Sequence, residues 1–416
     1  MKYFGTDGIR GEAYQDLTLS LAYKLGCAVD TFNTEIIIGM DTRYSSIDLA
    51  KALISGIKKS NVRFAGVIPT SGLMYYSLKH NVLAIMITAS HNPYQDNGFK
   101  VIDCGCKLSE AKQTEIEELI DNNYEEYIDQ KKDLIIDGEI LNEYYCLLDK
   151  YYCKSKYKIL FDAANGCYSE ILKKYYPNHI INCNPDGFNI YDKCGSTNLS
   201  RLIEKVKEKD YDYGFAFDGD GDRVILVDKF NRIYDGDFLV YLMAKKLKEE
   251  KLLQNNTIVL SEMSNPGLLE KLTEIDIQYI ITPVGDVNIF KAMSNGYILG
   301  AEPSGHIINR LVLPFGDGLL NAFQIINILN HIEFSKEYNQ INMFFSAKEN
   351  LKYQSTKPVN INLINKKIQK FNNQNRMVIV RKSGTEKVIR ITLFQRYKSG
   401  IYKNLNKIKK RVMKCI

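Results

Sequence analysis

The 416-residue sequence contains no tryptophan and no apolar run long enough to span a bilayer, so it offers no candidate membrane helix. It begins with "MKYFGTDGIRG", which lacks the apolar stretch of a secretory signal, and we expect a cytoplasmic protein without a membrane partner. Its nine cysteines are an odd number, include no Cys-x-x-Cys pair and lack histidines at zinc-site spacing. These absences argue against a disulfide scaffold and a structural zinc site, and they favour reduced thiols.

A strong excess of charge of one sign is also missing. Lys and Arg number 55 and Asp and Glu 49, which gives a net charge of only +6, and the two signs are interleaved through most of the chain. This argues against a nucleic-acid-binding protein, and the basic run "YKNLNKIKKRVMK" is typical of the solvated face of an amphipathic helix. A hydrophobic content of 45% is ordinary for a globular protein, and a chain of this length is expected to divide into several domains.

Apolar strand-like runs alternate with helical stretches, which predicts βαβ units and an α/β architecture with parallel or mixed sheets. The runs in "EIIIGMDTR", "YKILFDAANG" and "TIVLSEMSN" each end in acidic or small polar residues. They recur about 100 to 120 residues apart, which is consistent with three similar α/β domains in series. We expect a small α+β domain to follow, and place the four domains at residues 1–145, 146–245, 246–355 and 356–416.

The stretch "MITASHNPYQDNGFKV" (residues 86–101) leaves an apolar run and at once presents several polar side chains. Ligand sites of open α/β sheets gather on loops at strand ends, so Ser90 is a candidate nucleophile, with His91 and Lys100 nearby. The alternative is a turn in which Ser90 only caps a backbone group and Pro93 fixes the geometry. A Ser-His-Asp hydrolase fits poorly, because adjacent Ser and His side chains usually point apart and no Gly-x-Ser-x-Gly motif is present.

Three aspartates alternate with two glycines in "YGFAFDGDGDRV", at the end of another strand-like run. Carboxylates so close in sequence repel one another unless a cation gathers them, and the glycines let the backbone fold so that they converge. Oxygen ligands without His or Cys favour Mg²⁺, which commonly also takes phosphate oxygens. Asp218, Asp220 and Asp222 are therefore candidate metal ligands, and the alternative is a solvated acidic turn.

Two further loops carry polar residues next to strand-like runs. "ILGAEPSGHII" places Glu302, Ser304 and His306 after an apolar strand, and such donors and acceptors suit sugar hydroxyls, although ordinary polar loops also contain them. "VIVRKSGTEKVIR" places a guanidinium, two hydroxyls and a flexible backbone where a strand ends, which suits a phosphate cradle. The residues of this second loop are Arg381, Ser383, Gly384 and Thr385.

These four stretches, in this order, resemble the α-D-phosphohexomutase superfamily, and the opening "YFGTDGIRG" is most similar to its phosphoglucosamine mutase branch. The resemblance runs from residue 3 to about residue 392, and the combination is more specific than any one motif. It implies four domains around a central cleft, three of them similar and each contributing one loop. It also implies an isomerase that interconverts glucosamine 6-phosphate and glucosamine 1-phosphate, feeding UDP-N-acetylglucosamine and cell-envelope synthesis.

Matched residue by residue, the resemblance implies that Ser90 carries a phosphoryl group and, with the three aspartates, holds one Mg²⁺. Arg10 and Lys100 match positive residues near the transferred group, His91 shapes the serine loop, and Arg223 follows the metal loop. Glucosamine 1,6-bisphosphate is the implied intermediate and activator, and an activating kinase and a second copy of the chain are candidate partners. The implied substrate-binding residues are Glu302, Ser304 and His306 at the sugar, and Arg381, Ser383, Gly384 and Thr385 at the phosphate that is not transferred.

The sequence departs from the pattern of this branch in its second half. Ala301 and Pro303 stand where the sugar loop usually has Gly and Gln, Lys382 and Lys387 replace two prolines of the phosphate loop, and Val287 replaces a common Arg. These differences leave open a phosphomannomutase or phosphoglucomutase that uses the same residues, or a non-catalytic sugar-phosphate-binding protein on the same fold. A phosphatase with an Asp nucleophile fits poorly, because such enzymes want Thr or Val at the third aspartate.

Overall fold

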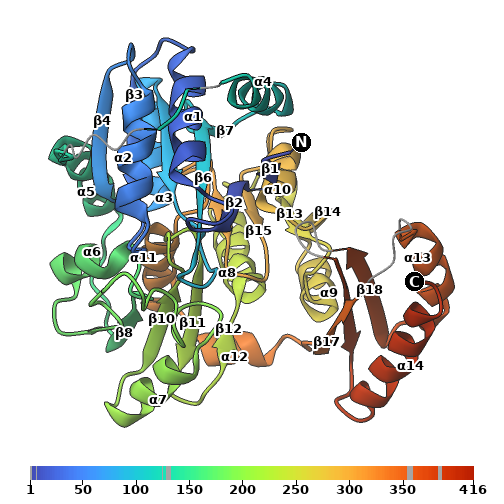
Figure 1. The fold of residues 1–416 in the computed structure, drawn as a ribbon. Coiled ribbons are helices and arrows are strands. Elements are labelled where there is room, and N and C mark those ends of the chain that lie inside the picture. Colours follow the sequence, from blue (N-terminus) through green and yellow to red (C-terminus); the bar gives the residue numbers. More distant parts are fainter. Residues whose placement is uncertain (1, 6, 124, 128–132, 354–358, 383–386) are drawn as a thin grey trace. The chain divides into compact units, whose positions relative to one another are not determined.

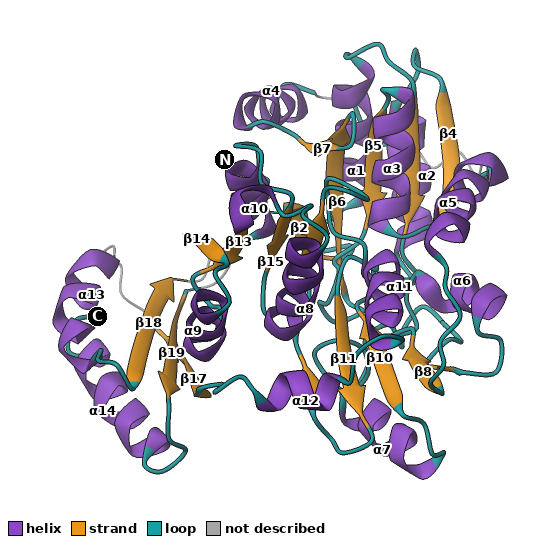
Figure 2. Cartoon of the chain, turned by 180° about the vertical axis from the view of Figure 1, so that it is seen from behind, coloured by secondary structure: helices purple, strands orange, loops and turns teal. Residues whose placement is uncertain are grey.

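The computed structural model describes residues 1–416 except 1, 6, 124, 128–132, 354–358 and 383–386 (Figure 1). The chain forms two compact units, one made of residues 1–239 and 304–332 and the other of residues 240–303 and 333–416. Helices and strands alternate in both units, as Figure 2 shows, and the predicted α/β class with mixed sheets is confirmed. Among the described helices, none combines the length and the apolar character needed to cross a membrane.

The first unit begins with a mixed sheet in which the strands lie in the order β1-β2-β6-β5-β3-β4, with β7 paired to β6. β3 is parallel to both β4 and β5, whereas β6 is antiparallel to β5 and to β2. The strands are β1 (Phe4–Gly5), β2 (Gly8–Glu12), β3 (Ile36–Met40), β4 (Val62–Val67), β5 (Leu83–Ile87), β6 (Asp96–Asp103) and β7 (Cys106–Lys107).

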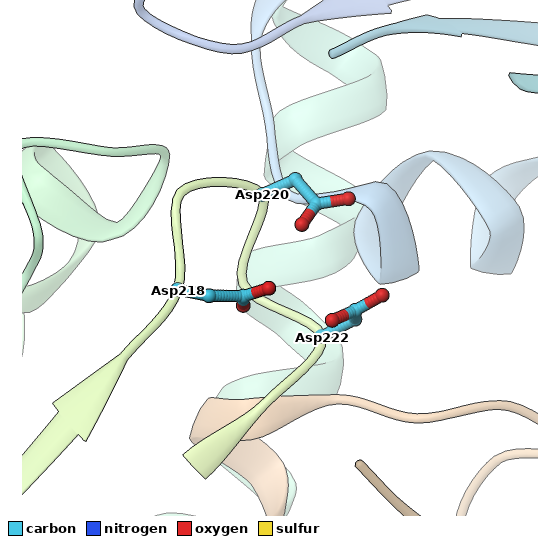
Figure 3. A group of neighbouring side chains, drawn as sticks. All are labelled: Asp218, Asp220 and Asp222. Carbon is cyan, nitrogen blue, oxygen red and sulfur yellow. The ribbon is translucent and has the colours of Figure 1, made fainter. Parts of the chain in front are cut away.

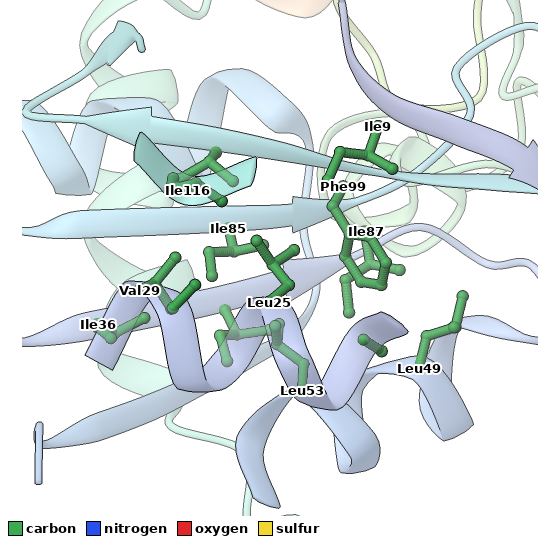
Figure 4. Close-up of a cluster of buried hydrophobic side chains, with 14 of the residues drawn as sticks. Ile9, Leu25, Val29, Ile36, Leu49, Leu53, Ile85, Ile87, Phe99 and Ile116 are labelled. Atoms are coloured by element: carbon green, nitrogen blue, oxygen red, sulfur yellow. The ribbon is translucent and has the colours of Figure 1, made fainter. Parts of the chain in front are cut away.

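A dense apolar core holds this sheet to its helices. All five residues of β5 are buried, and since successive side chains of a strand point to opposite faces, both faces of β5 are covered. Figure 4 shows Leu25 of α1, Leu53 of α2 and Ile85 of β5 as members of one cluster of buried side chains. The helices of this region are α1 (Leu19–Asp30), α2 (Ser46–Gly56), α3 (Thr70–His80), α4 (Glu110–Asp121) and α5 (Gly138–Tyr151).

A second mixed sheet of the first unit has the order β12-β11-β10-β8-β9. β10 is parallel to β8 and antiparallel to β11, so the loop between β10 and β11 lies at one end of buried strands. The elements are β8 (Ile159–Asp162), α6 (Tyr168–Tyr175), β9 (Ile180–Ile181), α7 (Ser200–Glu208), β10 (Tyr213–Phe217), β11 (Val224–Asp228) and β12 (Ile233–Tyr234), with β16 (Ile307–Asn309) and α11 (Gly318–Leu329).

The second unit contains the parallel strands β14-β13-β15 and, near the C-terminus, an antiparallel sheet of order β17-β19-β18. β17 pairs with β19 along its whole length, so this small sheet begins at Phe345. The elements are α8 (Gly236–Glu249), which leads into the unit, η1 (Gln254–Asn256), β13 (Thr257–Ser261), α9 (Pro266–Glu274), β14 (Gln278–Thr282), α10 (Asp286–Met293), β15 (Leu299–Ala301), α12 (Phe334–Asn339), β17 (Phe345–Lys352), α13 (Ile361–Ile368), η2 (Gln369–Phe371), β18 (Arg376–Lys382), β19 (Val388–Gln395) and α14 (Ile401–Met413).

Leu25→Ala should destabilise the first unit, because Leu25 is fully buried in the core between α1 and the sheet. We expect a loss of about 2–5 kcal/mol in the free energy of unfolding, from lost burial and an unfilled cavity. Urea unfolding followed by far-UV circular dichroism measures it. The matched control is Leu78→Ala on α3, where the side chain is 41% exposed, and an equal loss in both variants would contradict the core assignment.

Candidate active site

Ser90 lies on the loop that follows β5, and its backbone is in the left-handed region with φ of 52°. This conformation costs a residue with a Cβ atom about 1–2 kcal/mol, so the surrounding structure must hold it in place. The Ser90 amide donates to Thr88 Oγ1 at 2.8 Å. The Ser90 hydroxyl is buried and donates to Asp218 Oδ2 at 2.8 Å, which joins the two loops singled out by the sequence.

The loop between β10 and β11 brings Asp218, Asp220 and Asp222 together (Figure 3). One carboxylate oxygen from each residue lies within 4.8 Å of the others, and all three residues are buried. Gly221 makes this turn possible, because its φ of +80° is unfavourable for a residue with a side chain. The described residues therefore contain a buried acidic triad that can hold a metal ion.

The donor chemistry of this triad fits a hard cation. Asp220 Oδ1 and Asp222 Oδ1 are buried and have no hydrogen-bond partner within the described part of the chain. Burial, with repulsion from Asp222 and Asp220, raises the pKa of Asp218 well above its usual range. A divalent cation would coordinate the carboxylate oxygens that have no hydrogen-bond partner. It would also stabilise the ionised carboxylates and so lower the pKa of Asp218.

Lys100, on β6, supplies positive charge next to the triad. Its ammonium lies 2.7 Å from Asp220 Oδ2 and 3.3 Å from Asp7 Oδ2. Burial alone would lower the pKa of Lys100, but the carboxylates of Asp220 and Asp7 raise it above its usual range and the side chain stays charged. Asp7 also accepts from Arg10 and Lys107 at 2.5 Å each. Burial favours protonated Asp7, yet these three cations hold its pKa well below its usual range.

The N-terminus of α3 holds one side of the metal loop. The Thr70 amide donates to the Asp220 carbonyl oxygen at 3.0 Å, and Thr70 Oγ1 donates to Asp220 Oδ2 at 2.7 Å. Sequence reasoning did not identify Thr70 or Asp7 as members of the site. Asp7 stands three residues before Arg10 in the quoted "GTDGIRG", and that acidic residue was the available signal. Thr70 carries no local signal, because only tertiary packing brings α3 to the metal loop.

Arg223, which directly precedes β11, and His306 also border the triad. Arg223 Nε lies 3.6 Å from Asp222 Oδ1 and 3.8 Å from Asp218 Oδ2, and the Arg223 amide donates to Asp218 Oδ1 at 3.1 Å. His306 forms a β-bridge with Arg223 and its Nδ1 lies 3.7 Å from Asp222 Oδ2. Burial favours protonated Asp222, but Lys100, His306 and Arg223 hold its pKa well below its usual range.

His91 lies beside the serine without a short contact to it. The distance from His91 Nδ1 to Ser90 Oγ is 3.4 Å, at the long end for a hydrogen bond. Burial, with repulsion from Arg223 and Arg10, lowers the pKa of His91 to about 4. The ring is therefore neutral near pH 7.

The remaining site candidates belong mostly to the second unit. Glu302 follows β15 and its Oε1 accepts from the Gly285 amide at 2.9 Å. Arg381 is near the end of β18, where burial and Arg390 lower its pKa while the carboxylates of Glu262 and Glu302 oppose that shift. Ser304 is exposed on the loop before β16 in the first unit. Ser383, Gly384 and Thr385 lie outside the described residues.

The structure thus brings most of the candidates from the opening "YFGTDGIRG" and from the first three motifs into one cluster of the first unit. Its members are Arg10, Ser90, His91, Lys100, Asp218, Asp220, Asp222, Arg223 and His306. Glu302 and Arg381 lie in the second unit and are not members of this cluster. Val287 is half-buried in the first turn of α10, also in the second unit.

Sequence and structure comparisons relate the chain to known proteins. Residues 1–127, 143–231 and 235–343 match alpha/beta/alpha domains I, II and III of the phosphoglucomutase/phosphomannomutase family. The fold is similar to a phosphoglucomutase/phosphomannomutase family protein from Burkholderia thailandensis, with a TM-score of 0.82, 21% identity, and 99% and 97% of the two chains covered. It is also similar to N-acetylphosphoglucosamine mutase from Aspergillus fumigatus, with a TM-score of 0.64, 16% identity, and 99% and 96% covered.

Closer relatives by sequence are bacterial. The chain is 39% identical to the phosphoglucosamine mutase of Finegoldia magna, with 94% of each chain covered. It is 37% identical to the phosphoglucosamine mutase of Bacillus cytotoxicus, with 94% of this chain and 93% of the relative covered. With matches of this extent, the chain belongs to the phosphoglucomutase/phosphomannomutase family, in its phosphoglucosamine mutase branch.

Proposed function

We propose that the protein is a phosphoglucosamine mutase that interconverts glucosamine 6-phosphate and glucosamine 1-phosphate through a phosphoserine and a 1,6-bisphosphate. The observation that carries the proposal is the 2.8 Å hydrogen bond from the Ser90 hydroxyl to Asp218 within a buried acidic triad. A solvated acidic turn would be neither buried nor joined to a strained serine. The family of the chain supports the same activity.

In the proposed reaction, a sugar hydroxyl attacks the phosphorus of phosphorylated Ser90, the bond from phosphorus to Ser90 Oγ breaks, and a sugar bisphosphate forms. The bisphosphate turns end for end, and Ser90 Oγ attacks its other phosphoryl group to regenerate the phosphoserine and release the product. Transfer of this kind needs positive charge around the three outer phosphoryl oxygens. Lys100, which stays charged, lies 2.7 Å from Asp220 of the acidic triad, and Arg10 donates to the carbonyl oxygen of Ala89, the residue before Ser90.

We propose that Asp218, Asp220 and Asp222, together with the phosphoryl group on Ser90, hold one Mg²⁺. When bound, the ion would supply further positive charge to the phosphoryl oxygens. Lys100 and Thr70 both contact Oδ2 of Asp220, which leaves its Oδ1 for a metal.

The proposed roles of the domains follow the four loops: residues 1–145 carry the phosphoserine, 146–245 the metal, 246–355 the sugar-recognising loop and 356–416 the phosphate-binding loop. Glu302, Ser304 and His306 would contact sugar hydroxyls, and Arg381, Ser383, Gly384 and Thr385 the phosphate that does not react. Arg381 supports this role because it is half-buried, and burial together with repulsion from Arg390 lowers its pKa, so an anion would stabilise its charged form.

We propose a cytoplasmic location and a small-molecule phosphosugar as the substrate, with an activating kinase and a homodimer as candidate partners. None of the nine cysteines, all of which lie among the described residues, forms a disulfide, which supports a reducing compartment. A coupled assay with the 1- and 6-phosphates of glucosamine, glucose and mannose tests the activity. Higher kcat/KM with glucose or mannose phosphates would reassign the substrate, and no turnover of any of them would refute the proposal.

Ser90→Ala should abolish mutase turnover, because no other group carries the phosphoryl group between the two half-reactions. Intact-mass analysis of the wild-type protein should show a fraction about 80 Da heavier, the mass of one added phosphoryl group. That fraction should be absent in Ser90→Ala and present in the control Ser55→Ala, which changes a half-buried serine of α2. Normal turnover by Ser90→Ala would exclude the carrier role.

Asp220→Asn should weaken Mg²⁺ binding by at least about 10-fold, since even residues that only support metal ligands have effects of that size. Isothermal titration calorimetry measures binding directly, without reference to activity. The control is Asp212→Asn in the same domain, where the carboxylate pairs with Lys229 outside the triad. Unchanged Mg²⁺ affinity in Asp220→Asn would remove this residue from the metal site.

Arg381→Ala should lower kcat/KM for glucosamine 6-phosphate by roughly 30- to 150-fold, equivalent to about 2–3 kcal/mol for a charged hydrogen-bonding contact. Turnover should fall along with affinity, because the held phosphate also positions the reacting end. Lys348→Ala, which removes an exposed positive charge from β17 in the same sheet, is the control. A change below about threefold in Arg381→Ala is too small for such a contact and would contradict the docking assignment.

A further inference from the structure

The loop between β3 and α2 supplies a buried arginine that the proposed reaction does not use. Arg43 is 3% exposed and forms an ion pair with Asp41, with 2.9 Å between Arg43 Nε and Asp41 Oδ2. Both side chains of this pair are fully buried. An arginine is rarely buried unless all of its guanidinium N–H groups have acceptors. The acceptors of the remaining donors of Arg43 therefore show which part of the chain it fixes.

The other four N–H groups of the guanidinium donate to backbone carbonyl oxygens of the serine loop (residues 88–95) and of Asp96, the first residue of β6. Nη2 donates to Ser90 and Asn92 at 2.9 Å each. Nη1 donates to Asp96 at 2.8 Å and also to Pro93. All five donors of Arg43 are therefore used, one on Asp41 and four on the seven-residue stretch from Ser90 to Asp96.

The pair of Arg43 and Asp41 is also linked to the amide of Ser90, through Thr88. Thr88 Oγ1 donates to Asp41 Oδ2 at 2.7 Å and accepts from the Ser90 amide at 2.8 Å. The carbonyl group of Ser90 is thus fixed by Arg43, and its amide group is fixed by Asp41 through Thr88. These contacts on both sides hold Ser90 in its left-handed conformation, which directs Oγ to Asp218.

We propose that Arg43 is a positioning residue for phosphoryl transfer, which fixes the backbone of the serine loop so that Ser90 Oγ faces the acidic triad. The inference rests on the proposed function, since it assigns Arg43 a part in that reaction. Lysine cannot replace this arginine, because an ammonium has three donors on one atom and cannot reach four carbonyl oxygens in a plane. The role concerns the placement of the phosphoryl group, so it predicts an effect on kcat and little effect on KM.

The test compares the wild-type protein with Arg43→Lys. Dephosphorylated protein is incubated with Mg²⁺ and glucose 1,6-bisphosphate, and the rate of phosphoryl transfer to Ser90 is followed by intact mass. Mutase kcat and KM are measured with glucosamine 6-phosphate, and loss of the phosphoserine to water is measured separately. Arg43→Lys should lower the transfer rate and kcat by about 10- to 100-fold, the effect of a displacement near 1 Å. We expect KM to change less than about threefold and the ratio of hydrolysis to turnover to rise at least about 10-fold, because water adapts to a misplaced phosphoryl group.

Arg63→Lys is the matched control for a purely structural effect. Arg63, on β4 of the same sheet, is partly buried and pairs with Glu35, Asp137 and Glu139, outside the serine loop. This variant should lower the melting temperature but leave kcat within about twofold of the wild-type value. An equal loss of kcat in Arg63→Lys would show that loss of stability alone explains the result, and would overturn the proposal.

Two further outcomes decide against Arg43 as a positioning residue: a folded Arg43→Lys protein with kcat within about threefold of wild type, or a loss confined to KM. If Arg43→Lys does not fold, Thr88→Val replaces it, since this variant keeps the side-chain shape and removes only the link from Asp41 to the Ser90 amide. Thr88→Val should then lower kcat by at least about fivefold at unchanged KM, and unchanged kcat would overturn the proposal.

The wild-type measurements separate this inference from the proposed function. Wild-type protein that accepts the phosphoryl group but does not turn over glucosamine phosphates would refute the proposed substrate, and Arg43 would still be judged by the transfer rate. Wild-type protein that accepts no phosphoryl group at all would overturn both proposals.

Discussion

Repulsion among three carboxylates is the constraint around which the first unit is arranged. Asp218, Asp220 and Asp222 are buried with oxygens within 4.8 Å of one another, and burial makes each ionised carboxylate costly unless positive charge or hydrogen bonds offset it. Three chain segments far apart in sequence supply those groups. Lys100 on β6 and Arg223, which directly precedes β11, supply positive charge. Thr70 at the N-terminus of α3 supplies hydrogen bonds. Both sheets of the first unit therefore contribute to one electrostatic arrangement.

The parts that could be predicted from the sequence are those that short local patterns encode. β3, β8 and β13 are continuous apolar runs, and each ends where the sequence turns acidic or small. The alternation of Asp and Gly in one loop similarly predicts converging carboxylates, and the structure brings them together. Ser90 was a candidate because it follows a buried strand, which is a property of neighbouring residues only.

The parts that escaped prediction depend on contacts between distant residues. Thr70 and Asp220 are 150 residues apart, and nothing near either residue predicts their hydrogen bond. Arg43 ends one of the quoted strand motifs, but its four carbonyl acceptors lie on the loop after β5 and on the first residue of β6. They are 47 to 53 residues away in sequence, and a backbone acceptor carries no side-chain signal. β17 was missed for a different reason: Ala347 and Leu351 are its only buried residues, so the sequence "FSAKENLK" lacks the strict alternation of a half-buried strand.

The two hydrogen bonds from Thr70 to Asp220 join the first residue of α3 to the metal loop inside one compact unit. The serine loop is joined to the same loop through Ser90 and Asp218. A rigid-body displacement of the other unit would therefore leave the distance between the nucleophile and the acidic triad unchanged. The alignment of Ser90 with the acidic triad is therefore a property of the first unit alone, because the residues that fix it all lie within that unit.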